Sequence, residues 1–110
     1  MVHSVKEAIQ RLEAIPELSN KIAYDHFTTA QTMPYAVYIY DFRTTGADDY
    51  NGVMMVDFSI ELYSDIRLFS LEKKIIEAFV DVEIDSDTEY INDERMYQTV
   101  FNFTFPQKLS

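Results

Sequence analysis

The chain has 110 residues, a length that fits one domain spanning residues 1–110. Hydrophobic residues make up 47% of it and aromatic residues 15%, which is enough for a packed core and argues against disorder. Nine basic and 19 acidic residues give a net charge of −10, which disfavours binding to nucleic-acid phosphates and to anionic membranes. The chain contains no cysteine, so disulfides and thiolate metal sites are excluded.

The first predicted element is an amphipathic helix over residues 4–15. Ser4 is a typical helix cap, and Glu7, three residues later, completes the capping-box pattern. Apolar residues then recur at helical spacing until Pro16, which ends the pattern. The polar start of the chain shows neither a signal peptide nor a membrane span.

Two long strands are predicted in the middle of the chain. The connection after the helix is less regular, and a short strand containing Ile22, Tyr24 and Phe27 stays open there. Residues 35–42 are rich in aromatic and β-branched side chains and predict a strand. Residues 43–52 hold both glycines and predict a turn or an extended loop. Residues 53–63 alternate between apolar and polar, which predicts a half-buried strand.

A second helix and two further strands complete the expected fold. Ser70 is a candidate cap for a helix whose apolar stripe contains Leu71, Ile75, Ile76 and Phe79. A short strand is expected near residues 89–91 and a last one over residues 96–105, ended by Pro106. The order predicts an α+β fold, with an antiparallel sheet of about four strands and two helices packed on one face.

The sequence contains no recognisable catalytic or cofactor motif. His3 and His26 do not stand at metal-binding spacing, and we interpret His26 as a surface or capping histidine, not a general base. Asp85-Ser-Asp-Thr-Glu89 begins like a calcium-binding EF-hand loop, but Tyr90 and Met96 occupy its glycine and glutamate positions. We therefore interpret this segment as a solvated acidic turn and predict no metal, cofactor or catalytic residue.

The strand over residues 35–42 is apolar on both faces. Tyr35, Val37 and Ile39 alternate with Ala36, Tyr38, Tyr40 and Phe42. Two helices cover only one face of a sheet, so we expect another subunit to cover the second face. The loop after this strand is long for a hairpin and is expected to reach a neighbouring molecule. The candidate interface residues are Tyr35, Val37, Ile39, Arg43, Thr45, Asp48, Asp49 and Tyr50.

Four segments resemble the tail-completion proteins of long-tailed bacteriophages and prophages, also described as tail terminators or head–tail joining proteins. The likeness covers nearly the whole chain. It is carried by Met33-Pro-Tyr-Ala-Val-Tyr38, Val56-Asp-Phe-Ser-Ile-Glu-Leu-Tyr-Ser64, Leu71-Glu-Lys-Lys-Ile-Ile-Glu-Ala78 and Tyr90-Ile-Asn-Asp-Glu-Arg-Met-Tyr-Gln-Thr-Val-Phe-Asn-Phe103.

The resemblance implies an assembly role without catalysis. Such proteins have an α+β fold and form rings, commonly hexamers, that cap the tail tube and dock to the filled head. The implied partners are further copies of the chain, the tail-tube protein and a head-completion protein. The implied location is the cytoplasm of the bacterial host during assembly and the tail or head–tail interface of the virion afterwards.

Three other functions stay open at this stage. The first alternative is a small monomeric adaptor or inhibitor domain that binds a host protein. An acidic mimic of DNA would explain the net charge, but it requires carboxylates regularly spaced along one surface, whereas the acidic residues here alternate with core residues. An enzyme ranks last because no group of catalytic side chains is apparent.

Overall fold

Helix α1 (Val5–Glu13) begins at its predicted cap. In the computed structural model, which describes residues 1–43 and 52–108, the Glu7 backbone N–H donates to the Ser4 hydroxyl at 3.1 Å. The Glu7 carboxylate does not complete the capping box, because it contacts Arg11 at 2.7 Å and His3 at 3.3 Å. The helix ends at Glu13 instead of residue 15, and Pro16 starts the 3-10 turn η1 (Pro16–Leu18).

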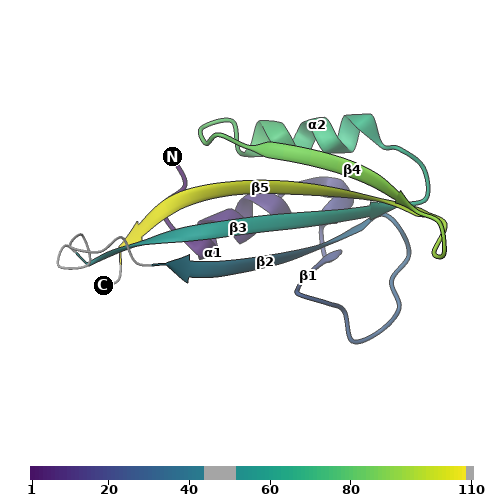
Figure 1. Cartoon of the computed structure of the whole chain (residues 1–110), viewed down its shortest axis with the longest axis horizontal. Coiled ribbons are helices and arrows are strands. Elements are labelled where there is room, and N and C mark those ends of the chain that lie inside the picture. Colours follow the sequence, from purple (N-terminus) through teal and green to yellow (C-terminus); the bar gives the residue numbers. More distant parts are fainter. Residues whose placement is uncertain (44–51, 109–110) are drawn as a thin grey trace.

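Five strands form one mixed sheet in the order β1-β2-β3-β5-β4 (Figure 1). The prediction of about four antiparallel strands was therefore incomplete. The short strand that the sequence left open forms over Ile22–Tyr24, without Phe27. It pairs in parallel with β2, because residues 25–34 carry the chain back to the same end of the sheet. All other neighbours are antiparallel. The strands are β1 (Ile22–Tyr24), β2 (Tyr35–Arg43), β3 (Val53–Ser64), β4 (Asp85–Ile91) and β5 (Met96–Lys108).

Helix α2 (Phe69–Ala78) connects β3 to β4. Its N-cap is Leu68, which makes no side-chain capping bond, so the prediction of Ser70 as the cap was wrong. Ser70 lies in the first turn of the helix instead. Leu71, Ile75 and Phe79 are buried as predicted, but Ile76 is 39% exposed. Neither helix within residues 1–43 and 52–108 is long and apolar enough to span a membrane.

The last two strands also differ from the prediction. The segment expected to be an acidic turn is strand β4, because its carboxylates alternate with Ser86, Thr88 and Tyr90. Strand β5 continues through Pro106 to Lys108. This is possible because β4 begins opposite Asn102, so only β3 lies beside the last residues of β5. A proline is tolerated where one side of a strand has no neighbour.

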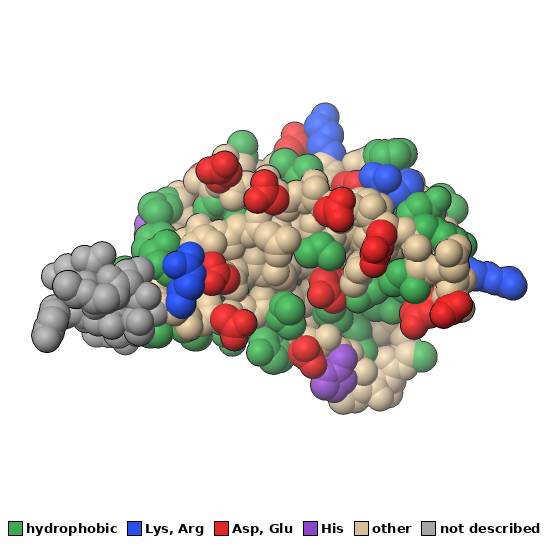
Figure 2. Space-filling model, in the orientation of Figure 1, with side chains coloured by type: hydrophobic (Ala, Val, Ile, Leu, Met, Phe, Trp, Pro, Cys, Tyr) green, Lys and Arg blue, Asp and Glu red, His purple; other side chains and the backbone are tan. Residues whose placement is uncertain are grey.

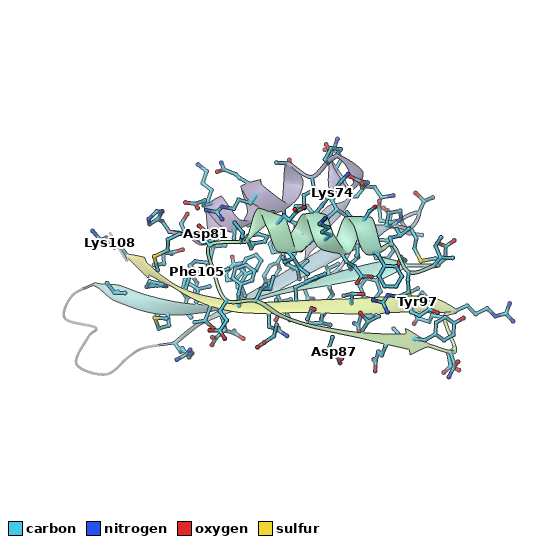
Figure 3. All side chains as sticks on the ribbon, turned by 90° about the horizontal axis from the view of Figure 1, so that it is seen from above. Lys74, Asp81, Asp87, Tyr97, Phe105 and Lys108 are labelled. Atoms are coloured by element: carbon cyan, nitrogen blue, oxygen red, sulfur yellow. The ribbon has the colours of Figure 1, made fainter. Side chains whose placement is uncertain are left out.

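The hydrophobic core lies between the sheet and the two helices, which cover the same face (Figures 1 and 3). Phe58 is at its centre, with its ring centroid 5.3 Å from that of Phe103 and 5.8 Å from that of Tyr38. Phe79 of the α2 C-terminus approaches Phe103 to 4.7 Å. Phe105 lies between the sheet and the helices, whereas Asp87 points to the opposite side (Figure 3). The other face of the sheet is therefore left to solvent or to a partner.

Candidate functional site: the open face of the sheet

The open face, the side of the sheet turned away from the helices, is organised in rows that run across the strands. Antiparallel pairing aligns alternate residues of β2, β3, β5 and β4 side by side. Each of three rows begins with an apolar residue on β2 and ends with a carboxylate on β4. The rows are Tyr35–Tyr63–Gln98–Glu89, Val37–Glu61–Val100–Asp87 and Ile39–Ser59–Asn102–Asp85.

Carboxylates are concentrated on this face. Figure 2 shows Asp and Glu side chains spread over it, whereas Lys and Arg side chains lie mainly towards its margins. Asp41 and Asp57 lie opposite each other in the register of β2 and β3, and they extend the acidic surface beyond the three rows. The alternation of acidic with core residues therefore does not exclude a regular acidic surface, as the sequence suggested, because alternation along a strand places the acidic residues of that strand on one face.

A cleft of about 420 Å³ lies at the β1 end of the open face. One wall is the connection from Asp25 to Gln31, and the floor is formed by Tyr35, Val37 and Tyr63. The Phe27 ring meets Tyr35 edge-on at 5.5 Å, and Tyr35 stacks on Tyr63 at 5.2 Å. Val37 is only 5% exposed as a result. The chain therefore covers part of its own apolar β2 face, and a subunit partner is not needed there.

Tyr63 is held in place by hydrogen bonds on both sides of its hydroxyl. The Gln98 Nε2 group donates to the Tyr63 oxygen at 2.9 Å, and the hydroxyl donates to Glu61 Oε1, also at 2.9 Å. Burial, together with the hydrogen bond to Glu61, raises the pKa of Tyr63 to about 12. The floor of the cleft is thus neutral and fixed at ordinary pH, with a carboxylate beside it.

At the end of the open face away from the cleft, an ion pair joins β2 to β3. Arg43 Nε and Nη2 donate to the Asp57 carboxylate at 2.7 and 3.2 Å, and Thr104 donates to the same carboxylate at 2.8 Å. The hydrogen bonds from Arg43 and Thr104 lower the pKa of Asp57. Ser59 and Asn102 are also hydrogen-bonded across β3 and β5. These bonds hold the polar middle of the face in one arrangement.

The candidate interface residues fall into two groups. Tyr35, Val37 and Ile39 lie together on the open face, and Arg43 lies at its end, paired with Asp57. Four further candidates lie outside the described residues: Thr45, Asp48, Asp49 and Tyr50. The sequence interpretation missed the contribution of Tyr63 and of the β4 carboxylates. The alternation of Asp85, Asp87 and Glu89 with uncharged residues was the signal that predicts a strand there.

Groups with chemical reactivity are sparse on the open face. His26 lies at the rim of the cleft, largely exposed, with its Nδ1 atom 2.9 Å from the Asp25 carboxylate. Among residues 1–43 and 52–108, no group of three His, Cys, Asp or Glu side chains is placed to hold a metal ion. The polarity of the open face thus changes across the strands, from apolar along β2 to acidic along β4.

Comparison with known proteins establishes the fold. No protein-family model and no curated protein matches the sequence. A solved structure described as the virion of a native gene transfer agent (GTA) particle contains a chain with the same fold, at a TM-score of 0.61. The two chains are 16% identical, and the match covers 88% of each. At this identity the likeness concerns the fold and not the function.

Proposed function

We propose that this chain is a structural protein of a phage-like virion, and that it acts as a tail-completion subunit. In this role it caps the tail tube, joins the tail to the head and catalyses no reaction. The observation that carries the proposal is the fold shared with a chain of a GTA virion over 88% of both chains. The resemblance of four segments to phage tail-completion proteins, read from the sequence, supports the same role.

The composition of the open face is suited to binding another protein. Its β2 side offers the exposed Ile39 as an apolar anchor, and its β4 side offers carboxylates with no ion pair among the described residues. A partner that matches this face presents apolar groups beside basic ones. We assign the open face to the tail-tube or head-completion protein, which leaves the edges of the sheet for contacts between copies in a ring.

The proposal places the chain in the cytoplasm of a bacterial host during assembly and in the virion afterwards. Deletion of the gene from a bacterium that produces the particles provides the test. Electron microscopy should show filled heads separate from tails, with tails of irregular length. The wild-type gene supplied from a plasmid should restore joined particles. Joined particles of normal length from the deletion strain would refute the role, and recovery of the chain as a monomer bound to a host protein would favour an adaptor or inhibitor.

One substitution tests the face itself. Ile39→Asp adds a charge to the apolar side of the open face, where Ile39 is 36% exposed and contributes little to the core. The variant should fold and yet fail to restore joined particles. Lys6→Asp, an equally drastic change at an exposed position of α1, serves as the matched control and should restore them. Equal rescue by both variants would remove the open face from the proposal.

A further inference from the structure

Strand β4 forms one edge of the sheet and has a neighbouring strand on one side only. Within residues 1–43 and 52–108, the backbone of Asp85–Tyr90 forms no hydrogen bond to any backbone segment except β5. Alternate residues of such a strand point their N–H and C=O groups away from the sheet, where a further strand can bind them. The β4 edge is therefore a place where an extended segment can add to the sheet.

The side of β4 that belongs to the open face is acidic. Asp85, Asp87 and Glu89 lie on it at alternate positions, and all three are exposed. None of them forms an ion pair within the described part of the chain. Residues two apart in an added strand repeat at the same spacing of about 7 Å. Basic side chains at alternate positions of that strand would each lie beside one carboxylate.

Helix α2 extends past this edge in the layer behind the sheet. Viewed onto the open face, α2 lies beyond β4, whereas α1 lies behind the middle of the sheet (Figures 1 and 3). Leu71 and Ile75 of α2 are buried in the core. Lys74 marks the side of the helix that faces the segment after α1, because it pairs with Glu17 at 2.8 Å. The remaining side of α2 is turned outward, past the β4 edge.

This outward side of α2 is apolar and is not used by the core. Phe69 is 66% exposed and Ile76 39%. The two residues are seven positions apart, which is two helical turns, so they lie on the same side of the helix. Val80, 81% exposed, lies just after the helix. A strand added beside β4 would lie in front of this side and cover it, so the apolar residues of α2 have a place in the fold only when such a strand is present.

We infer that the β4 edge binds an extended segment of a partner protein as an added strand, in which basic residues alternate with apolar ones. The basic side chains lie on the open face beside Asp85, Asp87 and Glu89, and the apolar side chains lie on the helix face against Phe69 and Ile76. The inference rests on the proposed function and deepens it, because it gives the form in which a basic partner engages the open face.

A second copy of this chain does not fit the β4 edge. No two Lys or Arg residues stand two positions apart anywhere in the sequence, so no segment of the chain supplies the alternation. Pairing of two β4 edges would place carboxylates against carboxylates, and such charges prevent edge strands from associating with one another. The added strand therefore comes from a different protein. Of the two edges of the sheet, only the one formed by β1 and β2 then remains for contacts between copies.

Two peptides of equal composition and charge test the alternation. Acetyl-Lys-Val-Lys-Val-Lys-Val-Lys-amide has the expected period, and acetyl-Lys-Lys-Val-Val-Val-Lys-Lys-amide does not. In titrations of the whole chain followed by backbone amide NMR signals, the alternating peptide should bind at least about tenfold more tightly. Hydrogen exchange of the β4 amides that point away from β5 should slow at least about tenfold, since they gain a hydrogen-bond partner. Equal affinities, or binding without this protection, would overturn the inference.

Matched substitutions at exposed positions test both sides of the edge. Asp87→Lys should weaken binding of the alternating peptide about tenfold or more, whereas Asp93→Lys, the same charge change in the turn after β4, should weaken it less than about threefold. Ile76→Ser should weaken it about fivefold, and Ile39→Ser, at a similarly exposed position on β2, should leave it unchanged. The dispersion of the amide signals checks that each variant is folded. Equal effects within either pair would contradict the added strand.

Failure of this inference is distinct from failure of the proposed function. Unjoined heads and tails in the deletion strain, together with equal affinities for the two peptides, would keep the virion role and remove the added strand. Joined particles from the deletion strain, together with selective binding of the alternating peptide, would refute the role and keep the binding site at the β4 edge.

Discussion

The Arg11 guanidinium donates both Nη groups to the Asp81 carboxylate, at 2.6 and 3.0 Å, and so joins α1 to the turn after α2. Arg11 also donates to the Ala78 carbonyl oxygen at 3.1 Å and lies 5.9 Å from the centre of the Phe79 ring. The N-terminal amino group binds the same carboxylate. One ion pair thus connects two segments that are 70 residues apart in the sequence.

This ion pair predicts loss of stability in acid. The hydrogen bonds from Arg11 and from the N-terminus hold the pKa of Asp81 well below its ordinary value of 3.8. The free energy of unfolding should therefore decrease as the pH falls below about 4, when the unfolded state takes up a proton that the folded state resists. Urea denaturation at several pH values measures this slope. Asp81→Asn should flatten the slope, and equal slopes for wild type and variant would contradict this explanation.

Phe58 predicts the largest loss of stability from a single core substitution. Its side chain is 1% exposed and contacts Phe103, Tyr38 and Tyr40. Phe58→Ala should lower the free energy of unfolding by about 3–5 kcal/mol, because it removes buried area and leaves a cavity. Phe42→Ala, the same change at a 43% exposed position, should cost about 0.5 kcal/mol or less. Similar losses for both variants in urea titrations would contradict the placement of the core.

Tyr63 predicts a loss of stability at alkaline pH. Its folded pKa of about 12 lies above the ordinary value of 10.0, so the unfolded state releases the proton first as the pH rises. Stability should decrease between about pH 10 and pH 12 on this account. Tyr63→Phe should remove that part of the decrease and cost about 0.5–1.5 kcal/mol at neutral pH through the lost hydrogen bonds. The formation of tyrosinate can be followed by absorbance as the pH is raised. The difference between the wild-type and variant curves should show one tyrosine that ionises at higher pH than an ordinary tyrosine.

Replacement of Arg95 by glycine is expected to stabilise the protein. It ends the turn between β4 and β5 with a φ angle of 53°, a left-handed conformation that glycine adopts without steric cost. Arg95→Gly should raise the free energy of unfolding by about 0.5–1 kcal/mol, the relief of strain being partly offset by greater freedom of the unfolded chain. Arg95→Ala keeps the Cβ atom and should give no such gain. Equal unfolding midpoints for both variants would disprove the explanation.

Local patterns predicted most elements of the fold. The Ser4 cap, the alternation along β3 and the apolar stripe of α2 each depend on residues close in sequence, so they could be recognised without a structure. The parallel pairing of β1 could not, because it depends on the path of residues 25–34 through space. The strand through Pro106 was missed for a similar reason, since the proline is tolerated only where β4 is absent.

The open face was predicted in part. The two-sided apolar character of β2 pointed to Tyr35, Val37 and Ile39, and the structure places all three on that face. The sequence pattern could not show that Phe27 and its neighbours would cover Val37, because the covering segment has no regular periodicity. Nor could it show which strands would be neighbours, and the rows from β2 to β4 depend on that order.

Because the open face is apolar along β2 and acidic along β4, its negative charge is concentrated at one side. A basic molecule approaching from solution experiences attraction mainly towards the β4 side, so it is rotated before it makes contact. Salt screens such attraction over about 10 Å at 0.1 M ionic strength. Rising ionic strength should therefore slow the association of a partner with this face much more than it speeds dissociation. Under the proposed function, the charge distribution of the sheet guides the approach of a basic partner and sets the orientation in which the two first meet.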